Sequence, residues 1–261
     1  MSQEGTQAIR RAAAILQRIA HVAEQEPPTL RGISQAVDLP RSTVHRILKC
    51  LTDEGLAHYD PKTRRYEIGM LSYELGLAVT DRVLQLVPWT TAVDRVAARA
   101  NVTTYLMRRS GMEAVCVHKA EGRTVIRVIP VEVGQRRYLG VGAGATALLA
   151  GLPDETVNRV IAAVAPDLGA FADLSPSRIR DAVAHARRTG YAESEGRAYS
   201  SIYGLGIGVK AHSEEPDIAI SIAAHAPEVN KTRIAEWKAI IEEEIAATHA
   251  AIRARAEMAK R

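Results

Sequence analysis

Residues 29–69 read TLRGISQAVDLPRSTVHRILKCLTDEGLAHYDPKTRRYEIG, and the spacing of their apolar side chains changes from that of helices to that of strands. Thr29 offers its side-chain oxygen as the N-cap of a short helix, which ends at Asp38-Leu39-Pro40. A proline before a helix and a glycine after it are typical boundaries, so a second helix is expected from Arg41 to the residue before Gly55. The stretch therefore begins with two helices joined by a tight turn.

The neighbouring segments complete this unit. Residues 56–59 and 64–68 have the composition of strands, and the Asp60-Pro61-Lys62-Thr63 sequence between them has turn chemistry, which predicts a hairpin. Upstream, apolar residues three and four apart over residues 6–25 predict an amphipathic helix. Three helices followed by a two-stranded wing are typical of a winged helix-turn-helix.

The second helix of the pair has a polar, cationic face. Its polar positions three, four and seven residues apart are Ser42, His45, Arg46 and Lys49. No acidic residue occurs between positions 41 and 52, and the Arg, Lys, Ser, Thr and His side chains present there are those that bond phosphates and base edges. The alternative is an ordinary solvated helix face, but the tight turn before the helix and the basic wing after it favour DNA binding.

Composition excludes several classes of protein. The chain has 261 residues, 47% hydrophobic and 25% charged, which is typical of a globular protein of one or two domains. No run approaches roughly 20 apolar residues, and residues 1–11 lack the order of a signal peptide, so we expect a cytoplasmic protein that does not enter a membrane. Cys50 and Cys116 are far apart and lack neighbouring metal ligands, so neither zinc nor a disulfide is expected.

The rest of the chain predicts a second domain of α+β class with a mostly antiparallel sheet. A linker helix is expected over residues 70–87. Beyond it, we expect helices at 90–100, 146–150, 155–164 and 176–189, strands at 103–107, 114–118, 124–128, 202–209 and 217–223, and a long C-terminal helix. The last two strands flank a turn-rich segment, so they are expected to pair antiparallel.

One face of this strand pair is nearly without side chains. The positions that share it are Gly204, Gly206, Gly208, Ala219, Ser221 and Ala223. The opposite faces carry bulky aliphatic residues, because successive side chains of a strand alternate in direction. Either a closely packed helix or a small-molecule pocket covers the bare face, and both can hold along different stretches.

Residues 140–145, GVGAGA, form a glycine-rich turn before the helix expected at 146. The pattern formally matches a dinucleotide-binding fingerprint, but no strand-helix-strand unit of the right length follows it, so no cofactor is expected. Glycines let a ligand approach the backbone, and a helix N-terminus favours an anion by about 0.3–1 kcal/mol. A small organic acid is therefore the expected guest. No set of nucleophile, base and acid indicates catalysis, so we expect no enzyme and no catalytic residues.

The chain resembles a known family over nearly its whole length. Residues 39–48, LPRSTVHRIL, are similar to the recognition-helix motif of the isocitrate lyase regulator (IclR) family of bacterial transcription factors. Residues 134–150 are similar to a segment of the family's effector domain, as are Gly190-Tyr191-Ala192 further on. The resemblance implies a winged helix-turn-helix followed by a GAF-like effector-binding domain.

The resemblance also implies which side chains meet DNA. The residues expected in the major groove are Ser42, Thr43, His45 and Arg46, those expected at phosphates are Thr29, Lys49, Arg64 and Arg65, and Arg41 is counted among the DNA contacts. Two reading helices are needed for a two-fold site, so we expect a homodimer or a dimer of dimers on a palindromic double-stranded operator.

In family members, the effector lies among the glycine-rich turn, the residue after the Gly-Tyr motif and the last two strands. The corresponding residues are Gly142, Ala143, Gly144, Ser194, Ile202, Gly204, Ser221 and Ala223. Members that bind small keto acids usually have an acid where Ser194 stands and a serine where Ala223 stands. Because this pocket has fewer polar anchors, we expect a larger, flatter guest such as an aromatic carboxylate, with Tyr105, Met107 and Tyr203 as apolar walls.

The sequence thus predicts a ligand-responsive transcriptional regulator with domains at 1–69, 70–87 and 88–261. Two alternatives remain: an enzyme that acts on a small organic acid and carries an accessory helix-turn-helix, or a winged-helix module that binds protein. Turnover of candidate acids would indicate the enzyme, and a steep loss of DNA affinity with salt would exclude the protein-binding module.

Overall fold

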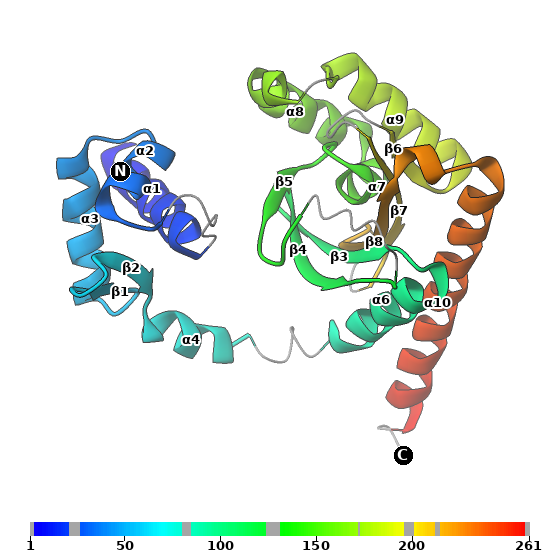
Figure 1. Cartoon of the computed structure of the whole chain (residues 1–261), viewed down its shortest axis with the longest axis horizontal. Coiled ribbons are helices and arrows are strands. Elements are labelled where there is room, and N and C mark those ends of the chain that lie inside the picture. Colours follow the sequence, from blue (N-terminus) through cyan, green and yellow to red (C-terminus); the bar gives the residue numbers. More distant parts are fainter. Residues whose placement is uncertain are drawn as a thin grey trace. The chain divides into compact units, whose positions relative to one another are not determined.

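The computed structural model describes residues 3–20, 27–79, 85–123, 131–171, 173–195, 201–211 and 215–258. The chain divides into two compact units, Met1–Gln85 and Leu86–Arg261 (Figure 1). Each unit has its own core of buried apolar side chains.

The first unit is the expected winged helix-turn-helix. Its elements are α1 (Gln3–Ala20), α2 (Leu30–Ala36), α3 (Arg41–Asp53), β1 (Ala57–Asp60), β2 (Arg65–Ile68) and α4 (Met70–Leu77). Thr29 caps α2 as predicted, because its Oγ1 accepts a hydrogen bond of 3.2 Å from the Gly32 N–H. The core consists of Ile15, Ile19, Ile33, Val44, Leu48, Leu51, Ala57 and Tyr66, so the apolar side of α3 is the side that packs on α1 and α2.

The wing is a short antiparallel hairpin in which Asp60 pairs with Arg65. The Asp60 carboxylate accepts hydrogen bonds from the Thr63 hydroxyl at 2.7 Å and from the Lys62 N–H at 2.9 Å, and these bonds hold the pKa of Asp60 below its ordinary value. Arg64 follows with a φ of +56°, which reverses the chain into β2. The turn chemistry that the sequence predicted therefore closes the hairpin.

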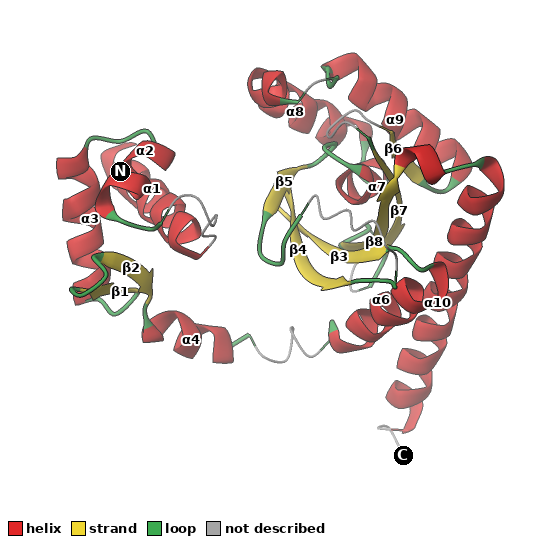
Figure 2. Cartoon of the chain, in the orientation of Figure 1, coloured by secondary structure: helices red, strands yellow, loops and turns green. Residues whose placement is uncertain are grey.

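The second unit is built on a six-stranded antiparallel sheet with strand order β5-β4-β3-β8-β7-β6 (Figure 2). Its strands are β3 (Thr103–Ser110), β4 (Glu113–Ala120), β5 (Arg136–Tyr138), β6 (Ala192–Glu195), β7 (Ile202–Val209) and β8 (Ile218–His225). Its helices are α6 (Val87–Ala100), α7 (Ala143–Ala150), α8 (Asp154–Val164), η1 (Ala165–Ala170), α9 (Pro176–Thr189), η2 (Ala226–Glu228) and α10 (Lys231–Met258).

Helices cover both faces of this sheet. On one face, α6 packs on β3 and β4 and α10 packs on β7, over a core that includes Leu205 and Ile220. Helix α7 packs on the other face, with α8 and α9 beyond it. The buried Glu244 carboxylate joins α10 to α6 through Arg95 at 2.7 Å and Arg99 at 2.8 Å. Burial opposes the charge of Glu244, but the two arginines hold its pKa below the ordinary value.

Three boundaries differ from the expectation. Helix α4 ends at Leu77 instead of continuing to residue 87, and residues 80–84 lie outside the described part. Helix α6 begins at Val87 and not at 90, and Pro88 sits in its first turn, where its missing N–H costs no hydrogen bond. Helix α7 begins at Ala143 and not at 146, because its small residues give no hydrophobic periodicity to mark the start. The strand expected at 124–128 lies outside the described residues.

Candidate functional site

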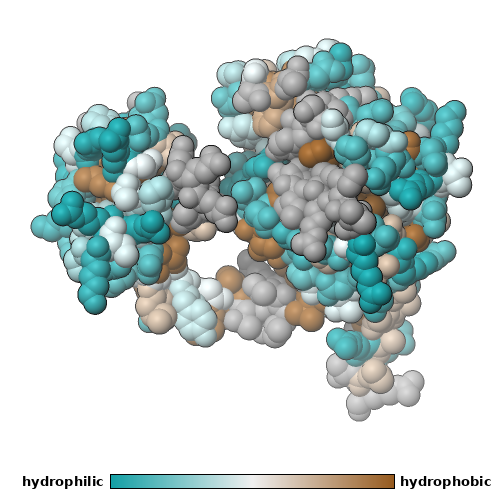
Figure 3. Space-filling view, in the orientation of Figure 1, coloured by the Kyte–Doolittle hydropathy of each residue, from teal (hydrophilic) through white to brown (hydrophobic). Residues whose placement is uncertain are grey.

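The polar side of α3 is not covered within its own unit. Its exposed residues include Arg41, Ser42, His45, Arg46 and Lys49. Thr43 is half-buried, and the side chains that carry the packing lie on the opposite face of the helix. The surface around α3 and the wing is largely hydrophilic (Figure 3). The helix therefore presents its cationic side to solvent, as a duplex-binding helix must.

The predicted contacts flank α3 on two sides. His45 and Lys49 line a groove toward the wing together with Thr29 and Arg64, whereas Arg46 and Thr43 line a groove toward α1. Of the other predicted contacts, Arg41 and Ser42 are exposed at the start of α3, and Arg65 is exposed on β2. The structure therefore gathers these side chains around one helix face and its two borders, and none of the nine is buried in the core.

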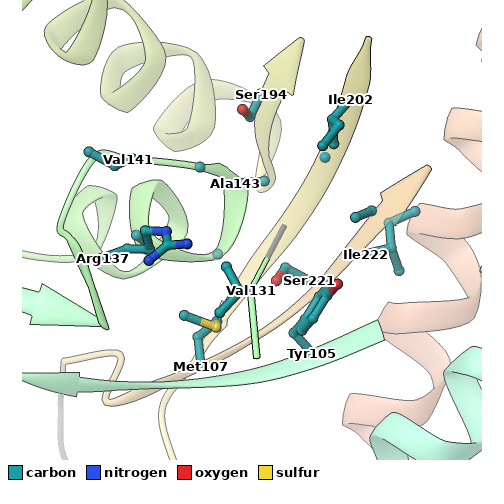
Figure 4. A pocket seen from close by; sticks show the side chains of 15 residues that line it. Tyr105, Met107, Val131, Arg137, Val141, Ala143, Ser194, Ile202, Ser221 and Ile222 are labelled. Atoms are coloured by element: carbon teal, nitrogen blue, oxygen red, sulfur yellow. The ribbon is translucent and has the colours of Figure 1, made fainter. Parts of the chain in front are cut away.

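A second candidate site is a partly open cavity in the unit formed by residues 86–261 (Figure 4). It lies between the sheet and the N-terminal end of α7. Its lining consists of Tyr105, Met107, Val131, Arg137, Val141, Gly142, Ala143, Gly144, Ala145, Ser194, Ile202, Gly204, Ser221, Ile222 and Ala223. Ten of the eleven residues predicted for the effector site are in this set.

Strand register explains why these residues meet. Tyr105 of β3 pairs with Ser221 of β8, and Gly204 of β7 pairs with Ala223, so the four positions form adjacent parts of one sheet face. The turn into α7 lies above them, with Gly142 as the N-cap at a φ of +83°. The first N–H groups of α7 therefore border a cavity whose floor is nearly free of side chains around Gly204 and Ala223.

The sheet face that carries Gly204, Gly206 and Gly208 has different neighbours along its length. A Cβ atom at Gly206 would stand 2.7 Å from the backbone carbonyl of Ala143, and one at Gly208 would stand 3.0 Å from the Ala147 oxygen, so α7 packs directly on these two glycines. A Cβ at Gly204 would meet the Ala143 side chain at 3.1 Å and also lies at the cavity. The bare face is therefore covered by the packed helix α7 at one end and borders the cavity at the other.

We expect Gly206→Ala to lower the free energy of unfolding by about 1–3 kcal/mol, because the added methyl group displaces the α7 backbone. The matched control is Gly169→Ala in the same unit, where a Cβ meets no atom within 4 Å, and we expect a change within about 0.5 kcal/mol. Urea denaturation followed by circular dichroism measures both. Equal stability of the two variants would contradict the close packing of α7 on β7.

One predicted wall residue is wrong. Tyr203 lies on the opposite face of β7, where its ring packs near Trp237 of α10 and its hydroxyl donates to the Glu193 carboxylate at 2.6 Å. The reason is the two-residue period of a strand: if Gly204 faces the cavity, its neighbour Tyr203 must face away.

The prediction also missed five lining residues, Val131, Arg137, Val141, Ala145 and Ile222. Arg137 differs from the rest in being charged, and it lies on β5, a strand of three residues that no sequence pattern indicated. The consecutive arginines at 136 and 137 were the available signal, because on a strand one of two neighbours must face inward.

Two ionisable groups at or near the cavity stay neutral at pH 7. Burial raises the pKa of the Cys116 thiol to about 11 and also raises the pKa of Tyr105. The thiol is thus not an activated nucleophile, and the Tyr105 hydroxyl remains a hydrogen-bond donor. Within the described ranges, no three His, Cys, Asp or Glu side chains gather as metal ligands would, and no helix is long and apolar enough to cross a membrane.

These two units define a class of protein, a transcriptional regulator in which a winged helix-turn-helix is joined to a ligand-binding unit of sheet and helices. Residues 8–61 match the IclR helix-turn-helix domain, and residues 86–249 match the C-terminal domain of the bacterial transcriptional regulator IclR. The chain belongs to the IclR family. It is accordingly a regulator with a DNA-binding domain and a C-terminal effector domain, as the resemblance implied.

Relatives and solved structures agree with this assignment. The HTH-type transcriptional regulator KipR of Bacillus subtilis is 24% identical over 79% of this chain and 82% of its own length. An IclR regulator from Alicyclobacillus acidocaldarius shares the fold with a TM-score of 0.73, at 22% identity over 93% of this chain and 97% of that one. An IclR homologue from Microbacterium hydrocarbonoxydans, solved with 4-hydroxybenzoate, has a TM-score of 0.68 at 20% identity, over 92% of this chain and 99% of that one. At these sequence identities, the likeness to the two solved structures shows a shared fold.

Proposed function

We propose that this regulator binds a palindromic operator through the exposed face of α3 and that an aromatic carboxylate in the cavity of the second unit changes the affinity. The observation that carries the first part is the exposed face of Ser42, His45, Arg46 and Lys49. A helix of this width fits the major groove, and its cations lie where a duplex presents phosphates and base edges.

The side chains divide into two roles in this proposal. Ser42, Thr43, His45 and Arg46 read base edges, and Thr29, Lys49, Arg64 and Arg65 hold phosphates, with Arg41 at the start of the helix. Phosphate contacts fix orientation and supply salt-dependent affinity, while base contacts supply sequence preference. The groove toward the wing brings three of the proposed phosphate-binding residues, Thr29, Lys49 and Arg64, to one border of α3, with His45 beside them.

The effector proposal is supported by the shape and chemistry of the cavity. Among the described residues that line it, most are apolar, and the polar side chains are the hydroxyls of Tyr105, Ser194 and Ser221, and Arg137. The Microbacterium structure with 4-hydroxybenzoate supports an aromatic acid as the class of effector.

We infer further that two copies of the chain bind one operator. One reading helix with its wing makes too few contacts for tight specific binding, and a two-fold site matches a protein dimer in symmetry. The effector then acts by favouring one spacing of the two reading heads, and a tenfold change in operator affinity needs only about 1.4 kcal/mol of coupling.

The experiment that tests this function is selection of duplexes from a random-sequence DNA pool by the full chain, followed by a thermal-shift screen of acids. We expect an inverted repeat to be enriched and an aromatic acid to raise the melting temperature, because a ligand of the native state stabilises it. Enrichment of a single unrepeated site would contradict the two-copy proposal. Stabilisation only by small keto acids such as pyruvate would contradict the aromatic class.

A further inference from the structure

The cavity combines an apolar body with one cationic side chain. Among the described residues that line it, Arg137 is the one that is charged at pH 7. In the view of Figure 4, its guanidinium lies between the turn at Val141–Ala143 and Met107. The hydroxyls of Tyr105 and Ser221 lie on the floor of the same cavity, away from this group. The site therefore has a positive end and a separate hydroxyl end.

The fold determines which of the two neighbouring arginines is at the cavity. Arg136 faces away and is engaged with Glu113, from its Nε to the carboxylate at 2.7 Å, and with the Ser110 hydroxyl at 2.9 Å. Arg137 alternates to the cavity side of β5, where the strand pairs it with Ala114. The same strand thus places Arg136 against Glu113 and Arg137 at the cavity.

Local hydrogen bonds orient the Arg137 side chain. Its Nη1 donates to the backbone carbonyl of Arg136 at 2.8 Å, and its Nη2 lies 3.4 Å from the Gln135 Oε1. These two hydrogen bonds orient the guanidinium at the cavity. An arginine held in this way is suited to carboxylates, because its planar donors match the two carboxylate oxygens.

We propose that Arg137 binds the carboxylate of the effector, which places the charged end of the guest at β5 and its apolar body on the Gly204–Ala223 floor. This inference rests on the proposed effector site and adds a direction and a specificity to it. The half-buried position of Arg137 makes the ion pair stronger than one in open water, and the nearby N-terminus of α7 favours the same charge. The site selects monocarboxylates over their neutral amides.

The test compares benzoate with benzamide by calorimetric titration of the full chain and its variants. We expect Arg137→Gln to weaken benzoate binding by about tenfold or more, since charge-assisted hydrogen bonds are lost. Arg137→Lys keeps the positive charge but loses the paired N–H donors of the guanidinium. Its benzoate affinity should therefore lie between those of the unmodified chain and Arg137→Gln. Arg136→Gln is the matched control on the same strand and should stay within about twofold of the unmodified chain. Benzamide should bind the unmodified chain weakly and be insensitive to Arg137→Gln.

The outcomes separate this inference from the proposed function. If Arg137→Gln retains its benzoate affinity while Gly204→Val loses it, the effector site stands and the assignment of Arg137 is wrong. If benzoate does not bind the unmodified chain at millimolar concentration, the aromatic effector proposal fails and this inference fails with it. Thermal unfolding of each variant verifies that a lost signal does not reflect a lost fold.

Discussion

Replacing both Arg46 and Lys49 by alanine should lower the affinity for the selected operator by roughly a hundredfold or more. Each removed side chain carries a charged hydrogen-bonding group worth about 1.5 kcal/mol or more, and every tenfold in affinity corresponds to about 1.4 kcal/mol. Both side chains are exposed, so the fold should not suffer. Fluorescence anisotropy of a labelled duplex at several salt concentrations measures the effect, and the dependence on salt should become shallower by about one for each phosphate-binding side chain removed.

The matched control removes the same charge from the other unit. Arg159 of α8 and Arg180 of α9 are exposed, and their double alanine variant lowers the net charge equally. We expect its operator affinity to stay within about twofold of the unmodified chain, because generic attraction between the net charge and DNA is screened over about 10 Å at ordinary salt. Equal losses in the two double variants would show that net charge, and not the face of α3, accounts for binding.

Gly204→Val should abolish the response of operator binding to an aromatic acid while leaving operator binding itself intact. A Cβ there already stands 3.1 Å from the Ala143 side chain, and the two further methyl groups of valine extend into the cavity where the guest would lie. The affinity loss for the acid should be at least about tenfold, a typical effect of overfilling a site. Titration of the acid into the protein–duplex complex measures it.

Its control is Gly169→Val, which adds the same side chain at a position where a Cβ meets no atom within 4 Å. This variant should respond to the acid like the unmodified chain. A full response in Gly204→Val, with a melting temperature close to that of the control, would mean that the effector binds elsewhere.

The accuracy with which the sequence predicts each helix and strand depends on the length and regularity of its hydrophobic pattern. The helix at α3 and the strand at β7 carry apolar residues at clear periods over eight residues or more, and the structure places both where the sequence did. The start of α7 was placed three residues late, since a run of glycine and alanine has no apolar face that marks a helix. The bounds and facing of a short element without hydrophobic periodicity depend on how the neighbouring elements pair and pack with it. That pairing cannot be read from the sequence of the element itself.

The cavity shows the same limit. Gly204, Ser221 and Ala223 were predicted from alternation along two strands and lie together in the structure. Tyr203 was assigned to the pocket against that same alternation, and the structure places it on the α10 side. Arg137 was missed because β5 has only three residues, so its inward direction follows from pairing with Ala114. A strand of this length gives no periodic signal of its own.

The proposed regulation is tested most directly by the affinity of the full chain for its selected operator with and without an aromatic acid that raises its melting temperature. We predict a change of about tenfold or more in either direction, since the guest must favour one arrangement of the reading heads over the other. An operator affinity that is the same at zero and saturating acid would contradict the link between the cavity and α3.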